Sequence, residues 1–132
     1  MSAFSPRQMF LLDEACKPIV AAFSFDGRDG LYLVGTAAAL DRQDYRDVDV
    51  RLMMNDDAYD TLVEATSADT VTFLGLAIGE YLAARTGLPI DFQIQRTTEA
   101  NERHKGIRNP IGSTRKLANY RGDAAPEEAD RD

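Results

Sequence analysis

Two aspartates separated by one residue are the strongest chemical signal in this chain of 132 residues. Asp47 and Asp49 alternate with valines, a pattern typical of a β-strand. Positions i and i+2 of a strand point to the same face, with Cα atoms roughly 6–7 Å apart. Two carboxylates held that close repel one another unless a cation or a proton lies between them, and Mg²⁺ prefers hard oxygen ligands. We therefore predict that Asp47 and Asp49 are metal ligands, for Mg²⁺ or Mn²⁺.

A third aspartate, Asp91, lies in the alternating segment IDFQIQ, which predicts another strand. If this strand lies beside the one that carries Asp47 and Asp49, the three carboxylates can hold two metal ions about 3.5–4 Å apart, the arrangement used for in-line phosphoryl displacement. The alternative is a solvated strand face, the commoner reading of a lone Asp-x-Asp, and Asp91 could equally be a solvent-facing residue.

Gly35 and Thr36 follow the first predicted strand and fit the remaining requirement, a phosphate site. A glycine where a strand turns into a helix lets the backbone approach a triphosphate, while a helix N-terminus and a hydroxyl offer donors. We predict that the nucleotide lies there. Taken singly, Gly35 could be only a tight turn and Thr36 only a helix cap.

The elements that must position these residues can be read from periodicity, caps and turn residues. We expect a helix over about 6–24 with Pro18 inside it, a strand over 31–34, a short helical turn over 36–40, a strand over 47–54, a helix opened by Asn55, a helix that ends at Gly87 and a strand over 90–95. This order predicts an α/β (α+β) fold, with a small mixed sheet of three or more strands flanked by helices.

In order and spacing, three segments resemble the motifs of the polymerase-beta-like nucleotidyltransferases: Val34-Gly35-Thr36, Asp47-Val48-Asp49 and Ile90-Asp91-Phe92. The resemblance covers about residues 8–96. It implies a nucleotidyltransferase-like fold and transfer of a nucleoside monophosphate from an NTP, such as ATP, to a hydroxyl on a protein, RNA or small molecule. It also implies that Asp47 and Asp49 hold the nucleotide-bound metal and share the second, that Asp91 ligates the second metal and helps to activate the acceptor, and that Gly35 and Thr36 contact the phosphates.

The chain departs from that family in the turn after Thr36, where alanines at 37–39 replace a more usual polar, Arg-containing turn. Phosphate contacts would then come from Arg42, Arg46 or Arg51, of which Arg51 shares the face of the paired aspartates. The chain has no obvious second helical domain, so it resembles the minimal members of the family, which often work with a partner protein or as dimers. Two alternatives stay open: a non-catalytic nucleotide- or partner-binding module, such as a toxin–antitoxin component, and a structural protein without a ligand.

Length and charge predict one nucleotidyltransferase-like domain over 1–100 and a partly disordered tail over 101–132, basic and then acidic. The net charge of −7 argues against nucleic-acid binding by the whole surface. Residues 96–121, however, carry seven Lys or Arg against two acids, which suits either a solvated tail or an arm that binds the acceptor or RNA.

The N-terminal residues, the lengths of the apolar runs and the content of Cys and His bear on the cellular location and on which metals the chain could bind. The N-terminus lacks a basic leader and no apolar run approaches the roughly 18 residues of a membrane span, so we expect a cytoplasmic protein with no membrane partner. One cysteine, Cys16, and one histidine, His104, cannot build a Cys/His zinc site. Any metal must be held mainly by oxygen.

Overall fold

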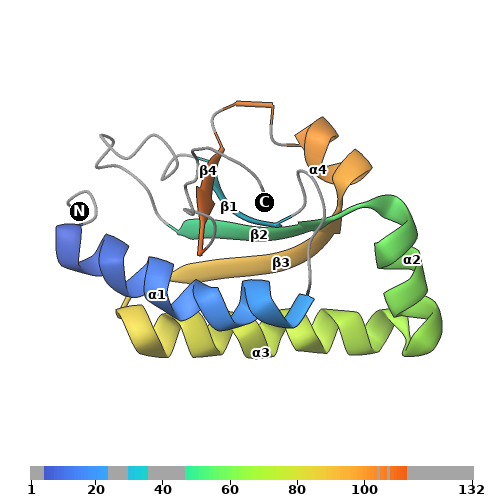
Figure 1. The fold of residues 1–132 in the computed structure, drawn as a ribbon, viewed down its shortest axis with the longest axis horizontal. Helices are drawn as coiled ribbons and strands as arrows, with labels where there is room; N and C mark the ends of the chain where they lie inside the picture. Colours follow the sequence, from blue (N-terminus) through green and yellow to red (C-terminus); the bar gives the residue numbers. More distant parts are fainter. Residues whose placement is uncertain (1–4, 24–29, 36–46, 104, 107, 113–132) are drawn as a thin grey trace, which may run out of the picture.

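The computed structural model describes residues 5–23, 30–35, 47–103, 105, 106 and 108–112. The elements, in chain order, are α1 (Pro6–Phe23), β1 (Gly30–Val34), β2 (Val48–Met54), α2 (Asp56–Ala65), α3 (Ala68–Thr86), β3 (Ile90–Arg96), α4 (Thr97–Arg103) and β4 (Asn109–Ile111). The predicted mixed α/β class is confirmed, because the strands form one mixed sheet flanked by helices (Figure 1).

The strands are arranged in the order β3-β2-β1-β4. β1 is antiparallel to both β2 and β4, whereas β2 and β3 are parallel. A parallel pair needs a long crossover, which α2 and α3 supply. The Val48 N–H donates to the Pro89 carbonyl at 2.8 Å, which holds the start of β2 beside the start of β3.

The two faces of the sheet differ because side chains alternate along each strand. From β2, the buried Val48, Val50 and Leu52 join the main core. Helices α1 and α3 lie along one face of the sheet, and α4 lies on the other side (Figure 1). On the α4 side, Ala100 is buried together with Val34 and Met53. Asp49 and Arg51, which alternate with the buried valines of β2, put polar side chains on the same face.

Two helix boundaries follow from capping residues seen in the sequence, Asn55 and Gly87. The Asn55 side chain accepts a hydrogen bond from the Ala58 N–H at 2.8 Å and so caps α2, which begins where the sequence predicts. Helix α3 ends at Gly87, which has a φ of 73°, the left-handed conformation typical of a glycine cap. Helix α1 runs through Pro18 as a single element.

The stretch after Arg96 contains more structure than the sequence predicts. Helix α4 follows β3 directly, and β4 pairs with β1 through Leu31–Ile111 and Leu33–Asn109. Residues 109–111 of the predicted tail therefore extend the sheet. Residues 113–132 and the helical turn predicted at 36–40 lie outside the described residues.

Helix length bears on the expectation of no membrane partner. In the part of the chain that the structure describes, no single helix is both long and apolar enough to cross a bilayer. Among the helices that the structure describes, α2 and α3 reach that length and composition when taken together, with a bend of 105° between them.

Candidate functional site

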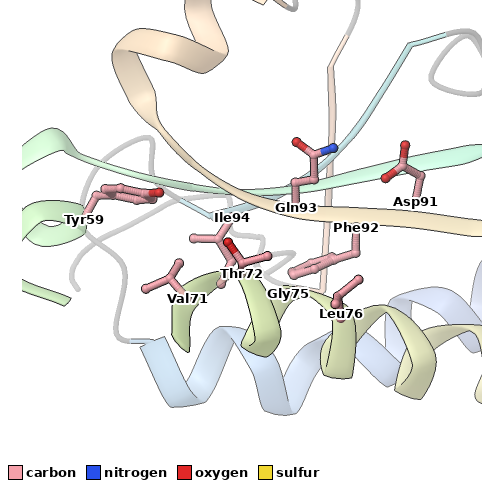
Figure 2. A pocket seen from close by; sticks show the side chains of 9 residues that line it. All are labelled: Tyr59, Val71, Thr72, Gly75, Leu76, Asp91, Phe92, Gln93 and Ile94. Atoms are coloured by element: carbon pink, nitrogen blue, oxygen red, sulfur yellow. The ribbon is translucent and has the colours of Figure 1, made fainter. Parts of the chain in front are cut away.

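Asp49 and Asp91 lie side by side on the second face of the sheet. They are direct partners in the parallel register of β2 and β3. Asp91 and Gln93 project from β3 on the side away from α3, whereas Phe92 points toward that helix (Figure 2). Both carboxylates remain open to solvent, since the Asp49 side chain is 31% exposed and that of Asp91 is 43% exposed.

Gly35 lies at the end of β1, directly against Asp49. Its φ is 72°, in the left-handed region that favours glycine. A Cβ atom added to Gly35 would lie 2.6 Å from Oδ2 of Asp49, closer than such atoms approach. The register that pairs Val34 with Asp49 explains this contact, because Gly35 is the next residue. The predicted phosphate-site glycine and one predicted metal ligand are therefore neighbours.

Arg51 lies on the same face and is buried, with 6% of its surface exposed. Its Nη2 lies 3.7 Å from Oδ2 of Asp91 and 4.0 Å from Oδ1 of Asp49. Its Nη1 donates to the Asp91 carbonyl at 2.7 Å and to the Val50 carbonyl at 3.1 Å. The guanidinium thus lies beside both carboxylates and is tied to the backbone, so as placed it is not free to contact a phosphate.

The electrostatics of Asp49 reflect this crowding. Burial raises the pKa of the Asp49 carboxyl above its usual value, Arg51 opposes that rise, and the charges of Asp91 and Asp47 add to it. Asp47 is exposed and directly precedes β2. The charges of the other two predicted metal ligands therefore act on Asp49, and of these Asp91 is its direct partner across the strands.

The ligand chemistry of these carboxylates suits Mg²⁺ or Mn²⁺, which bind through one or two carboxylates together with water and substrate phosphates. Among residues 5–23, 30–35, 47–103, 105, 106 and 108–112, no three Asp, Glu, His or Cys side chains are grouped as a ready-made metal site. As placed, Asp49 and Asp91 converge on the Arg51 guanidinium. Several predicted contributors lie outside the described residues, namely Thr36, Arg42 and Arg46.

Two glutamines of β3 belong to the same face but were not singled out from the sequence. Gln95 is 3% exposed, its Nε2 donates to Oε1 of Gln93 at 3.4 Å, and its own Oε1 has no partner among the described residues. The alternation of IDFQIQ that places Asp91 also places both glutamines, so the signal was present.

A groove of about 360 Å³ runs beside the edge strand β3, between that strand and α3. Its apolar side chains include Val71, Leu76 and Phe92, and Asp91 is one of its lining residues (Figure 2). Because the Asp91 carboxylate projects away from α3, the groove lies beside the β3 backbone, on the opposite face of the sheet from the carboxylates.

Comparison of the chain with protein-family models, with curated proteins and with solved structures found no match.

Proposed function

We propose that the chain is a metal-dependent nucleotidyltransferase, which moves a nucleoside monophosphate from an NTP to an acceptor hydroxyl. The observation that carries this proposal is the direct pairing of Asp49 with Asp91 on parallel strands, with Gly35 against Asp49. These are the neighbours that the resemblance to polymerase-beta-like nucleotidyltransferases implies. The sheet has the strand order needed to bring the three motifs together at one end.

In the proposed reaction the acceptor oxygen bonds to the α-phosphorus of the NTP as its proton passes to Asp91. The bond from that phosphorus to the oxygen bridging to the β-phosphate breaks, and pyrophosphate leaves. Asp91 suits this role because its side chain is 43% exposed, so an acceptor can approach the carboxylate from solvent. Gly35 and the backbone that follows it would face the triphosphate.

Asp47, Asp49 and Asp91 would hold Mg²⁺ or Mn²⁺, which neutralises phosphate charge when bound. The acceptor is a hydroxyl on a protein, RNA or small molecule, and a partner protein or second copy would complete the site. Magnesium–nucleotide complexes are cytoplasmic substrates, so we place the activity in the cytoplasm.

The test is a thermal unfolding titration with ATP, GTP, CTP and UTP, each with and without Mg²⁺. A ligand that binds only the folded state raises the unfolding temperature. We expect a magnesium-dependent rise with at least one NTP for the wild type and none for Asp47→Asn/Asp49→Asn. The charge-matched control is Asp57→Asn/Glu64→Gln, which changes two exposed acids of α2 and should keep the rise. A rise of equal size in all three proteins would overturn the proposed site.

A second candidate is a non-catalytic nucleotide- or partner-binding module of the same fold. The position of Arg51 favours it, because a guanidinium beside Asp49 and Asp91 already supplies positive charge where a metal would act. This candidate predicts tight NTP binding without turnover, unchanged by Asp49→Asn. The nucleotidyltransferase predicts that the same substitution abolishes metal-dependent binding and turnover together.

A further inference from the structure

Arg51 is the most unusual charged residue of the described chain, because it is buried while lying beside two acids. The side chain is 7% exposed, whereas those of Asp49 and Asp91 are 31% and 43% exposed. A buried charge is costly unless a partner compensates it. Here the partners are the two carboxylates that the proposed function assigns to a metal.

The guanidinium also offsets the mutual repulsion of Asp49 and Asp91. Adjacent carboxylates on paired strands destabilise a sheet, and a cation between them removes that cost. The charge of Arg51 lowers the pKa of Asp49 against the larger effect of burial. When no divalent cation is bound, Arg51 therefore reduces the repulsion between Asp49 and Asp91, as a bound cation would.

The hydrogen bonding of Arg51 is incomplete. Nη1 is satisfied by two carbonyl groups, and Nη2 lies within 4.0 Å of both carboxylates. Its Nε is buried and has no hydrogen-bond partner among the described residues. A buried donor left unpaired lowers the stability of that arrangement. The side chain is held there by the two backbone carbonyls and by the charges of Asp49 and Asp91.

We propose that Arg51 is a built-in counter-ion that competes with divalent cations for Asp49 and Asp91, so that a cation binds only as the guanidinium withdraws. This inference rests on the proposed function, because it takes the same carboxylates as metal ligands. It adds that the affinity for the cation is set by Arg51 as well as by the carboxylates. A like charge next to a bound cation disfavours it, and removing that charge strengthens binding.

The first test measures Mn²⁺ binding without nucleotide, by electron paramagnetic resonance of the free ion, for the wild type, Arg51→Met, Arg51→Lys and Arg51→Met/Asp49→Asn. Methionine removes the charge and lysine keeps it. We expect Arg51→Met to bind Mn²⁺ at least about tenfold more tightly than the wild type. Arg51→Lys should stay close to the wild type, and the added Asp49→Asn should abolish the gain.

Thermal unfolding of the same proteins gives a second signature. Without a cation, Arg51→Met should unfold at a lower temperature than the wild type, because two carboxylates lose their counter-ion. Mn²⁺ should restore more stability to it than to the wild type. Arg96→Met is the matched control, since Arg96 pairs with Asp60 on α2, and its Mn²⁺ response should equal that of the wild type. A folded Arg51→Met with unchanged or weaker Mn²⁺ affinity overturns the inference.

If Arg51→Met does not fold, the inference can still be tested on the wild-type protein. Addition of Mg²⁺ should shift the nuclear magnetic resonance signal of the Arg51 Nε–H and speed its hydrogen exchange as the side chain withdraws. Shifts at the Asp49 and Asp91 amides with an unchanged Arg51 side chain would overturn the inference and leave the proposed function standing. No binding of Mn²⁺, Mg²⁺ or metal–NTP by any folded variant would overturn both.

Discussion

Gly35 lies against the carboxylate of Asp49 so closely that a Cβ atom on the glycine would be 2.6 Å from Oδ2 of the aspartate. The turn that ends β1 and the side chain at the start of β2 thus share one small space. Residues that the sequence assigns to two roles, phosphate binding and metal binding, are in direct contact. A substitution in the turn should therefore act on the carboxylate.

Gly35→Ala tests that contact. The left-handed backbone at a φ of 72° should cost about 1–2 kcal/mol of stability for an alanine. The new methyl group should also displace the Asp49 carboxylate and weaken metal–NTP binding by roughly tenfold or more. Chemical denaturation and a binding titration measure the two effects. Gly87→Ala is the matched control, because its φ is 73° and nothing lies within 4 Å of its added Cβ. Equal binding by the two variants would contradict the prediction.

Asp49 should make stability depend on pH in an uncommon direction for an acid. Because its pKa is raised in the folded protein, chiefly by burial, the folded state holds the proton more tightly than the unfolded state does. The resulting stabilisation is complete below the unfolded pKa of 3.8 and is lost as pH rises through the folded pKa. Without divalent cations, Asp49→Asn should therefore raise Tm by about 1–4 °C at neutral pH and lose this advantage in acid.

Asp56→Asn is the opposite-signed control for that pH series. Hydrogen bonds from the Thr98 hydroxyl and N–H lower the pKa of Asp56, so its stabilisation is present above 3.8 and is lost as pH falls through the folded pKa. This variant should have a lower Tm than the wild type at neutral pH and the same Tm in strong acid. A Tm series over pH checks both variants, and a lower neutral Tm for Asp49→Asn would refute the account of that site.

Gly112→Ala should be far more destabilising than Gly87→Ala. Gly112 has a φ of 77°, and its added Cβ would lie 2.5 Å from Cβ and 2.9 Å from the backbone carbon of Cys16 on α1. The Gly112 N–H also donates to Oδ1 of Asp13 at 2.7 Å. Backbone strain and overpacking together should cost about 2–5 kcal/mol, measured by urea unfolding. A loss no larger than that of Gly87→Ala would show that β4 is not packed against α1 in this way.

Cys16 should be unreactive in the native protein. It is fully buried, and burial, with a smaller contribution from Asp13, raises its pKa to about 12, so almost no thiolate forms at neutral pH. Ellman's reagent should label the folded protein only slowly and the denatured protein at once. Since the sequence has one cysteine, the signal is unambiguous. Rapid labelling under native conditions would contradict the buried position.

The sequence predicts the core of the fold well because its signals are local. Alternation predicts β2 and β3, while Asn55 and Gly87 mark helix ends by known capping chemistry. β4 was missed because a three-residue strand containing Pro110 has no period to detect. Its pairing with β1 is a long-range event that no local pattern encodes.

The sequence predicts which residues of the candidate site share a face of the sheet, but not which of their side chains are in contact. Period-two alternation correctly puts Arg51 on the face of Asp49. It cannot reveal that the guanidinium turns back toward the carboxylates, because that choice depends on the neighbouring strand and its carbonyl groups. The parallel register that pairs Asp49 with Asp91 depends on the crossover between β2 and β3. The sequence therefore predicts this pairing only if the two strands are neighbours in the sheet.

The central claim is that a metal–nucleotide complex binds where Gly35, Asp49 and Asp91 meet. Paramagnetic broadening by substoichiometric Mn²⁺–ATP locates that complex directly in an amide-resolved magnetic resonance spectrum. The account predicts that the amide signals of Gly35, Asp49 and Asp91 broaden first, while that of Ala65, at the end of α2, persists. Broadening centred on the acidic helix α2, or spread evenly over the spectrum, would contradict it.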